Sequence, residues 1–166
     1  ATTCRHHASL NDRAVLRKPL TMEDYLQGRW ICEPFRIYDC TIEVDGGCAV
    51  VVTSAERARD MRQQPVYIVG YDFTHGPRVS WMQWPEGFST MYGKYVAPRL
   101  WDRTGLKPSD MDFAEIYDCF TYSVLCTLED FGFCKKGEGG PFAEEGNIQF
   151  GGSLPINTHG GLLNEG

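Results

Sequence analysis

Three side chains that could donate or exchange protons stand in two short passages of the sequence: Tyr117 and Asp118 in one, His159 in the other. A phenol, with an ordinary pKa near ~10, donates a hydrogen bond at neutral pH and becomes a base only where neighbours lower that value. A histidine titrates near neutrality and can exchange protons with a ligand. These residue types predict proton-transfer chemistry.

Each of these residues also has a purely structural interpretation. Tyr117 could be a core tyrosine at the end of a strand, because buried tyrosines usually keep one hydrogen-bond partner. Asp118 could stabilise a helix N-terminus through the helix dipole. His159, which lies between Asn157 and a pair of glycines, could bond to backbone alone. Cys119 begins an apolar helix and is interpreted as a packing residue, not as a nucleophile.

The elements around Tyr117 predict that it faces a ligand. Residues 113–117 are typical of a short strand, and residues 121–131 form an apolar helical stripe that ends at Gly132. This order puts residues 117–120 at the carboxyl end of a strand, where ligands bind in open α/β sheets. The glycine-rich segment 137–166 suits backbone that packs closely against itself or a substrate.

Further elements follow from capping and apolar periodicity. The pair Thr21 and Asp24 resembles a capping box, and Gly28 offers a stop. The patterns predict helices at 22–27, from Ser54 to about Arg62, and at 91–103, where Gly105 is the stop. They predict strands at 48–53, which would be covered on both faces, and at 66–71. Residues 74–87 are expected to form a loop that covers a pocket.

The composition excludes several classes of protein. A formal net charge of -6 argues against a nucleic-acid partner, because phosphate neutralisation requires clustered lysine and arginine. No apolar run approaches the ~20 residues of a membrane span, so we expect a soluble, cytoplasmic protein without a membrane partner. A hydrophobic content of 42% is ample for a core.

The cysteines and histidines near the N-terminus do not predict a disulfide framework or a metal site. The cysteine count is seven, an odd number, and most of them lie in apolar runs. We expect buried, reduced thiols. Cys4, His6 and His7 offer no evident fourth ligand, which a structural zinc site usually needs, so no metal is expected.

Four motifs occur in order along nearly the whole chain: Asp45–Glu56 (DGGCAVVVTSAE), Gly105–Asp112 (GLKPSDMD), Glu115–Phe120 (EIYDCF) and Leu154–Gly161 (LPINTHGG). Together they resemble the thiolase superfamily, specifically its sterol-carrier-protein-x and lipid-transfer-protein branch. The resemblance implies an α/β chain that is part of a five-layer αβαβα fold, with a mixed sheet covered by helices. Residues 1–64 would end the N-terminal half with a loop-domain remnant, and 65–166 would be the C-terminal half, truncated before its last catalytic loops.

The resemblance also implies a set of site residues. Where degradative thiolases have asparagine and sterol-carrier-type thiolases have histidine, this chain has Tyr117, which resembles the steroid side-chain aldolases. Tyr117, Asp118 and His159 are the expected catalytic residues. A coenzyme A thioester, as substrate and not as a permanent cofactor, is expected to contact Thr41, Asn157, Gly160 and Gly161. The loop with a nucleophilic cysteine would lie before Ala1, so the fragment alone should be inactive.

Three functions are consistent with this resemblance. The first is retro-aldol cleavage of a carbon–carbon bond in a steroid or lipid CoA thioester. The second is a cysteine-dependent acetyl-CoA acyltransferase, and the third is a non-catalytic lipid-binding or transfer subunit. A homodimer and a small OB-fold partner protein are the expected assemblies.

Overall fold

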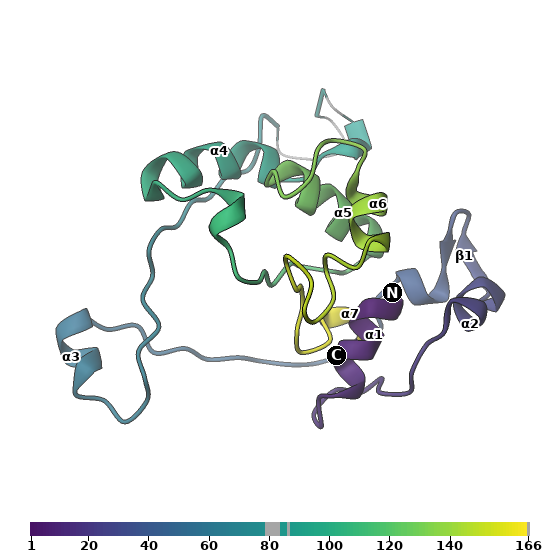
Figure 1. The fold of residues 1–166 in the computed structure, drawn as a ribbon, viewed down its shortest axis with the longest axis horizontal. Helices are drawn as coiled ribbons and strands as arrows, with labels where there is room; N and C mark the ends of the chain where they lie inside the picture. The colour runs from purple at the N-terminus through teal and green to yellow at the C-terminus, as the bar shows by residue number, and fades with distance from the viewer. Residues whose placement is uncertain (79–83, 86, 166) are drawn as a thin grey trace.

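The computed structural model describes residues 1–78, 84–85 and 87–165. Figure 1 shows a helical body, with the long traces around α3 standing apart from it. The helices, in chain order, are α1 (Thr2–Ser9), α2 (Met22–Gln27), α3 (Ala55–Arg59), α4 (Gly93–Thr104), α5 (Thr121–Asp130), α6 (Gly139–Glu144) and α7 (Leu162–Glu165), with 3-10 turns at Ile37–Asp39, Gly87–Ser89 and Pro108–Asp110.

The predicted helix boundaries are largely confirmed by capping contacts. Thr21 and Asp24 form the expected capping box at the start of α2. Ser54 accepts from the backbone of Arg57 at 3.4 Å, and α3 then ends at Arg59, earlier than expected. Helix α4 stops where Gly105 takes a left-handed conformation with φ of 69°.

The main apolar core lies between α5 and the segment that precedes α7. The amphipathic stripe of α5 packs against α6 and against the glycine-rich chain that follows it. Because these glycines allow sharp turns, the chain folds back and returns three apolar side chains to one helix face. The buried members of this core are Val124, Leu128, Ile148, Leu154 and Ile156.

Helix α1, near the N-terminus, packs against the C-terminal part of the chain. It packs against α7, and the backbone of Leu16 donates to the carbonyl of Asn164 at 2.9 Å. The buried imidazole of His7 lies 3.0 Å from the carbonyl of Ile156 through Nδ1. Since a carbonyl only accepts, Nδ1 carries the proton in this contact. Both termini therefore lie close together, as Figure 1 shows.

Two of the predicted strands are wrong for this structure. The described residues form a single sheet, an antiparallel pair of β1 (Trp30–Cys32) and β2 (Phe35–Arg36). Segments 48–53 and 66–71 pair with nothing in it, and Val50 and Val66 are 84% and 95% exposed instead of covered. A β-branched run favours extended backbone, but a strand also requires a neighbour that satisfies its N–H and C=O groups.

Other predictions have mixed outcomes. All seven cysteines are free thiols; Cys4 and Cys126 are buried, whereas Cys32 and Cys48 are exposed, contrary to expectation. The loop expected at 74–87 lies partly outside the described residues. Among the described ranges, no helix has both the length and the apolarity to span a bilayer.

Replacing Leu128 with alanine should destabilise the fold strongly. Leu128 is fully buried in the core, so truncation removes apolar contacts and leaves a cavity. We expect a loss of about 2–5 kcal/mol in the free energy of unfolding, measured by urea denaturation. The matched control Leu26→Ala changes an exposed leucine on α2 and should cost less than about 0.5 kcal/mol. Equal losses would contradict the assigned core.

Candidate active site

The segment that carries Tyr117 alternates in exposure. Phe113, Glu115 and Tyr117 are exposed, whereas Asp118 at its end is buried. The strand expected at 113–117 is reduced to one parallel bridge, between Ala114 and Ile156, because no further strand of the described chain lies beside it. The extended backbone nevertheless preserves the alternation, so the side chains at 113, 115 and 117 share one side.

Asn157 fastens the turn before α7 to this segment. Its side-chain oxygen accepts from the backbone N–H of Ile116 at 2.7 Å, and its side-chain nitrogen donates to the carbonyl of the same residue at 2.8 Å. The amide thus substitutes for a neighbouring strand. Asn157 is buried and has a positive φ of 45°, which asparagine tolerates better than most residues. Its side chain is occupied by these backbone contacts.

Asp118 holds the start of α7. Its carboxylate accepts from the backbone N–H of Leu162 at 2.7 Å and of Leu163 at 3.5 Å, and the residue is 1% exposed. Burial raises the pKa of the Asp118 carboxyl, and these N–H donors offset part of that effect. The contacts give Asp118 a positioning role, while its predicted catalytic role stays a prediction.

The paired glycines pack where a side chain does not fit. A methyl group on Gly160 would press against Ala8 of α1, and one on Gly161 would overlap the carboxylate of Asp118. Both glycines have positive φ, 120° and 69°. They bring α1 and the Asp118 segment into close contact with the turn between them.

Thr41 reaches the same cluster from a distant part of the chain. Its backbone N–H donates to the carbonyl of Cys119 at 3.0 Å, and its hydroxyl donates to the carbonyl of Leu162 at 3.0 Å. An antiparallel bridge between Cys40 and Phe120 supports this arrangement. The structure therefore brings Thr41 close to Asp118 and to the turn that carries the two glycines, while their predicted role in binding a CoA thioester stays a prediction.

His159 projects from this turn with a carboxylate at each ring nitrogen. Nδ1 lies 2.9 Å from Oε2 of Glu115, and Nε2 lies 3.2 Å from Oε2 of Glu165. Neither glutamate was among the site residues expected from the sequence. Glu115 was detectable, since it stands two residues before Tyr117 and two-residue spacing puts extended side chains on one side. Glu165 carried no signal, because only the fold of the turn brings it to the ring.

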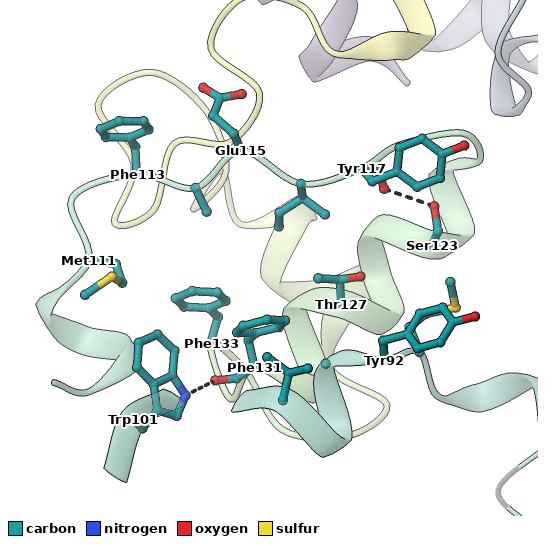
Figure 2. A pocket seen from close by; sticks show the side chains of 15 residues that line it. Tyr92, Trp101, Met111, Phe113, Glu115, Tyr117, Ser123, Thr127, Phe131 and Phe133 are labelled. Atoms are coloured by element: carbon teal, nitrogen blue, oxygen red, sulfur yellow. Dashed lines mark hydrogen bonds between the residues drawn. The ribbon is translucent and has the colours of Figure 1, made fainter. Parts of the chain in front are cut away.

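Tyr117 stands at one end of an apolar pocket of about 340 Å³ between its segment and helices α4 and α5. Figure 2 shows it at the opposite end from Trp101, with its backbone carbonyl accepting from Ser123. The phenol is 68% exposed. The neighbouring Cys119 thiol raises the pKa of Tyr117, so the phenol stays protonated at neutral pH and can donate.

The pocket wall is almost entirely hydrocarbon and aromatic. The indole of Trp101 donates to the backbone carbonyl of Phe131 at 3.1 Å, which fixes the indole ring in the wall. Such a surface suits an apolar ligand with few polar atoms. The larger side chains that line it are Met91, Tyr92, Val96, Trp101, Met111, Phe113, Ile116, Tyr117, Phe131 and Phe133.

Comparison with known proteins identifies the family. The family described as "Thiolase C-terminal domain-like" matches residues 82–166. The chain belongs to this thiolase family. The resemblance found in the sequence motifs is thereby confirmed, and the described residues are a thiolase-like domain with helices and a small two-stranded sheet.

Similar proteins include steroid-cleaving enzymes. The chain is 46% identical to a "17-hydroxy-3-oxo-4-pregnene-20-carboxyl-CoA lyase" of Mycobacterium tuberculosis, over 97% of this chain and 43% of that protein. It is 42% identical to a "Steroid side-chain-cleaving aldolase" of Thermomonospora curvata, over 99% and 43%. A solved structure described as "Ltp2-ChsH2(DUF35) aldolase" matches with a TM-score of 0.83 and 42% identity, over 99% and 44%. The thiolase-like chain thus spans less than half the length of these relatives.

Replacing Gly161 with alanine should destabilise the fold more than the same replacement at Gly105. Gly161 and Gly105 both have φ of 69°, but a methyl group at Gly105 meets no atom within 4 Å. We expect Gly105→Ala to cost about 1–2 kcal/mol through backbone strain. Gly161→Ala adds the overlap with Asp118 and should lower the free energy of unfolding by about a further 1–3 kcal/mol. Urea denaturation of both variants measures the difference; equal costs would contradict the packing.

The burial of Asp118 should make stability depend on pH. Because its pKa is raised in the folded state, the folded protein binds the proton more tightly than the unfolded chain. This contribution is complete below the ordinary aspartate value of 3.8 and is lost as pH rises through the folded value. The free energy of unfolding of the wild type, minus that of Asp118→Asn, should therefore fall between acid and neutral pH. A difference that is flat or rises over this range would refute the assignment.

Proposed function

We propose that the full-length protein cleaves a carbon–carbon bond in a steroid or similar lipid CoA thioester by retro-aldol chemistry. The similar proteins named as a CoA lyase and a steroid side-chain-cleaving aldolase support this function. The observation that carries it is the exposed phenol of Tyr117 at the end of an apolar pocket. A steroid offers the apolar surface that such a pocket would cover.

Retro-aldol cleavage requires two proton-related tasks. The proton of a β-hydroxyl group leaves, its oxygen forms a carbonyl, and the bond between the α and β carbons breaks. The bonding electrons pass to the α carbon and the thioester, where an enolate forms before a proton returns to the α carbon. An enzyme accelerates this reaction by accepting the hydroxyl proton and by stabilising the negative charge that develops on the thioester oxygen.

Tyr117 suits the second of these tasks. A phenol whose pKa is raised keeps its proton, so it acts as a hydrogen-bond donor to the thioester oxygen rather than as a base. The bond strengthens as that oxygen gains charge, which is the condition for accelerating the chemical step. His159 is the group proposed to exchange a proton with the substrate, and Asp118 with Asn157 fixes the backbone on which both residues depend.

The fold of the complete chain and the residues that contact the CoA thioester are proposed from the family. The complete chain would form the five-layer fold, with residues 1–64 in its first half and 65–166 in its second. The exposed segments 48–53 and 66–71 support this proposal, because their β-branched side chains suit strands that other parts of a longer chain would pair. Thr41, Asn157, Gly160 and Gly161 would line the site for the CoA thioester, Asn157 and the glycines chiefly through backbone.

A second protein is the proposed partner. The solved relative is described by two joined names, Ltp2 and ChsH2(DUF35), which supports a complex with a second protein. That this protein is a small OB-fold protein, and that the chain itself forms a homodimer, are proposed from the family alone. The acyltransferase alternative has its own support, a 31% identical "Acetyl-CoA acetyltransferase" of Methanothermobacter thermautotrophicus. Tyr117 favours the aldolase, because a cysteine-dependent transfer has no need of a phenol at that position. Release of a ketone or aldehyde from a β-hydroxyacyl-CoA distinguishes the two.

Tyr117→Phe in the full-length protein should abolish most turnover and leave the fold intact. The substitution removes only the hydroxyl that would bond to the thioester oxygen. We expect kcat for cleavage of a β-hydroxyacyl-CoA steroid to fall by about 10²-fold or more. Tyr67→Phe, at another exposed tyrosine, is the control and should not change kcat. Unchanged turnover in Tyr117→Phe would remove the phenol from the mechanism.

A further inference from the structure

The imidazole of His159 lies in a small polar network formed by three separate parts of the chain. Glu115 binds the turn with both carboxylate oxygens: Oε2 lies 2.9 Å from Nδ1 of His159, and Oε1 accepts from the hydroxyl of Thr158 at 2.9 Å. Asn11, which follows α1, donates to the backbone carbonyl of His159 at 2.8 Å and to Glu165 at 3.3 Å. The ring is therefore fixed at its backbone and at both nitrogens.

This network contributes to orientation more than to stability. The side chains of His159 and Glu115 are 44% and 41% exposed, and ion pairs at such exposure add little to the free energy of folding. A carboxylate at each ring nitrogen does, however, select one orientation of the ring. Because a carboxylate only accepts, Nδ1 is the donor to Glu115.

Glu115, the residue that contacts His159, lies on the same extended segment as Tyr117. Glu115 and Tyr117 stand two residues apart on an extended segment, so both project from one side of it. The backbone between them is fixed by Asn157, which bonds to both the N–H and the carbonyl of Ile116. The Glu115 carboxylate consequently holds the imidazole on the side of the segment from which the phenol projects.

We propose that Glu115 is a positioning residue, which fixes the orientation of the His159 ring through Nδ1 for the exchange of the substrate proton. This inference rests on the proposed function, in which His159 exchanges a proton with the substrate. Glu115 itself touches no reacting atom. Glu165, with the longer contact to Nε2, lies where it can take part in the onward transfer of that proton.

The test compares Glu115→Gln with Glu43→Gln in the full-length protein. Both changes remove one negative charge from an exposed glutamate, but only the first removes a carboxylate from His159. In Glu115→Gln the ¹⁵N signals of the His159 ring, identified by their loss in His159→Gln, should shift. The kcat for cleavage of the β-hydroxyacyl-CoA steroid should fall by about 10–100-fold, with KM unchanged. Glu43→Gln should alter neither.

Two further variants test whether Glu115 acts only through His159. The double variant of Glu115→Gln and His159→Gln should be no slower than His159→Gln alone, because Glu115 acts only through the ring. Glu115→Asp retains the carboxylate and should recover part of kcat. Unchanged ring signals in Glu115→Gln, or additive losses in the double variant, would overturn the proposal. If the wild type cleaves no CoA thioester, the proposed function fails, and the ring signals alone decide whether Glu115 orients His159.

Discussion

The structure around the candidate site depends on two buried polar side chains that bind backbone. Asn157 completes the hydrogen bonds of Ile116 as a neighbouring strand would, and Asp118 satisfies the first N–H groups of α7. Unpaired backbone groups are costly in a buried setting, so these contacts leave the turn little freedom. The phenol of Tyr117 and the imidazole of His159 both project from backbone that this pair of side chains holds.

The site divides into a buried layer and an exposed layer with different physical roles. In the buried layer, Asp118 and the glycines are fixed by close packing, and changes there act on stability. In the exposed layer, Tyr117, His159 and Glu115 are reachable by solvent, and their charges contribute little to folding. Changes in the exposed layer should therefore act mainly on chemistry, which makes the two layers separable by experiment.

The apolar pocket beside Tyr117 and the exposed segments 48–53 and 66–71 illustrate one general constraint. Apolar side chains and extended backbone require partners, the first for burial and the second for hydrogen bonds. Helices α4 and α5 supply one wall of the pocket, and their own backbone bonds are internal. An extended segment cannot satisfy its backbone hydrogen bonds from within, so these two segments are unpaired and exposed where the described chain offers no adjacent strand.

The sequence by itself determined the features that depend on near neighbours. Capping at Thr21, the stop at Gly105, the stripe of α5 and the motifs of the thiolase family were all readable from local order. The tertiary structure alone decided that Asp118 is buried beneath α7, that Glu115 and Glu165 meet His159, and that two β-branched segments lie open. The reason is physical: a helix satisfies its backbone from within, whereas a strand, a buried carboxylate and an ion pair depend on residues far away in the chain.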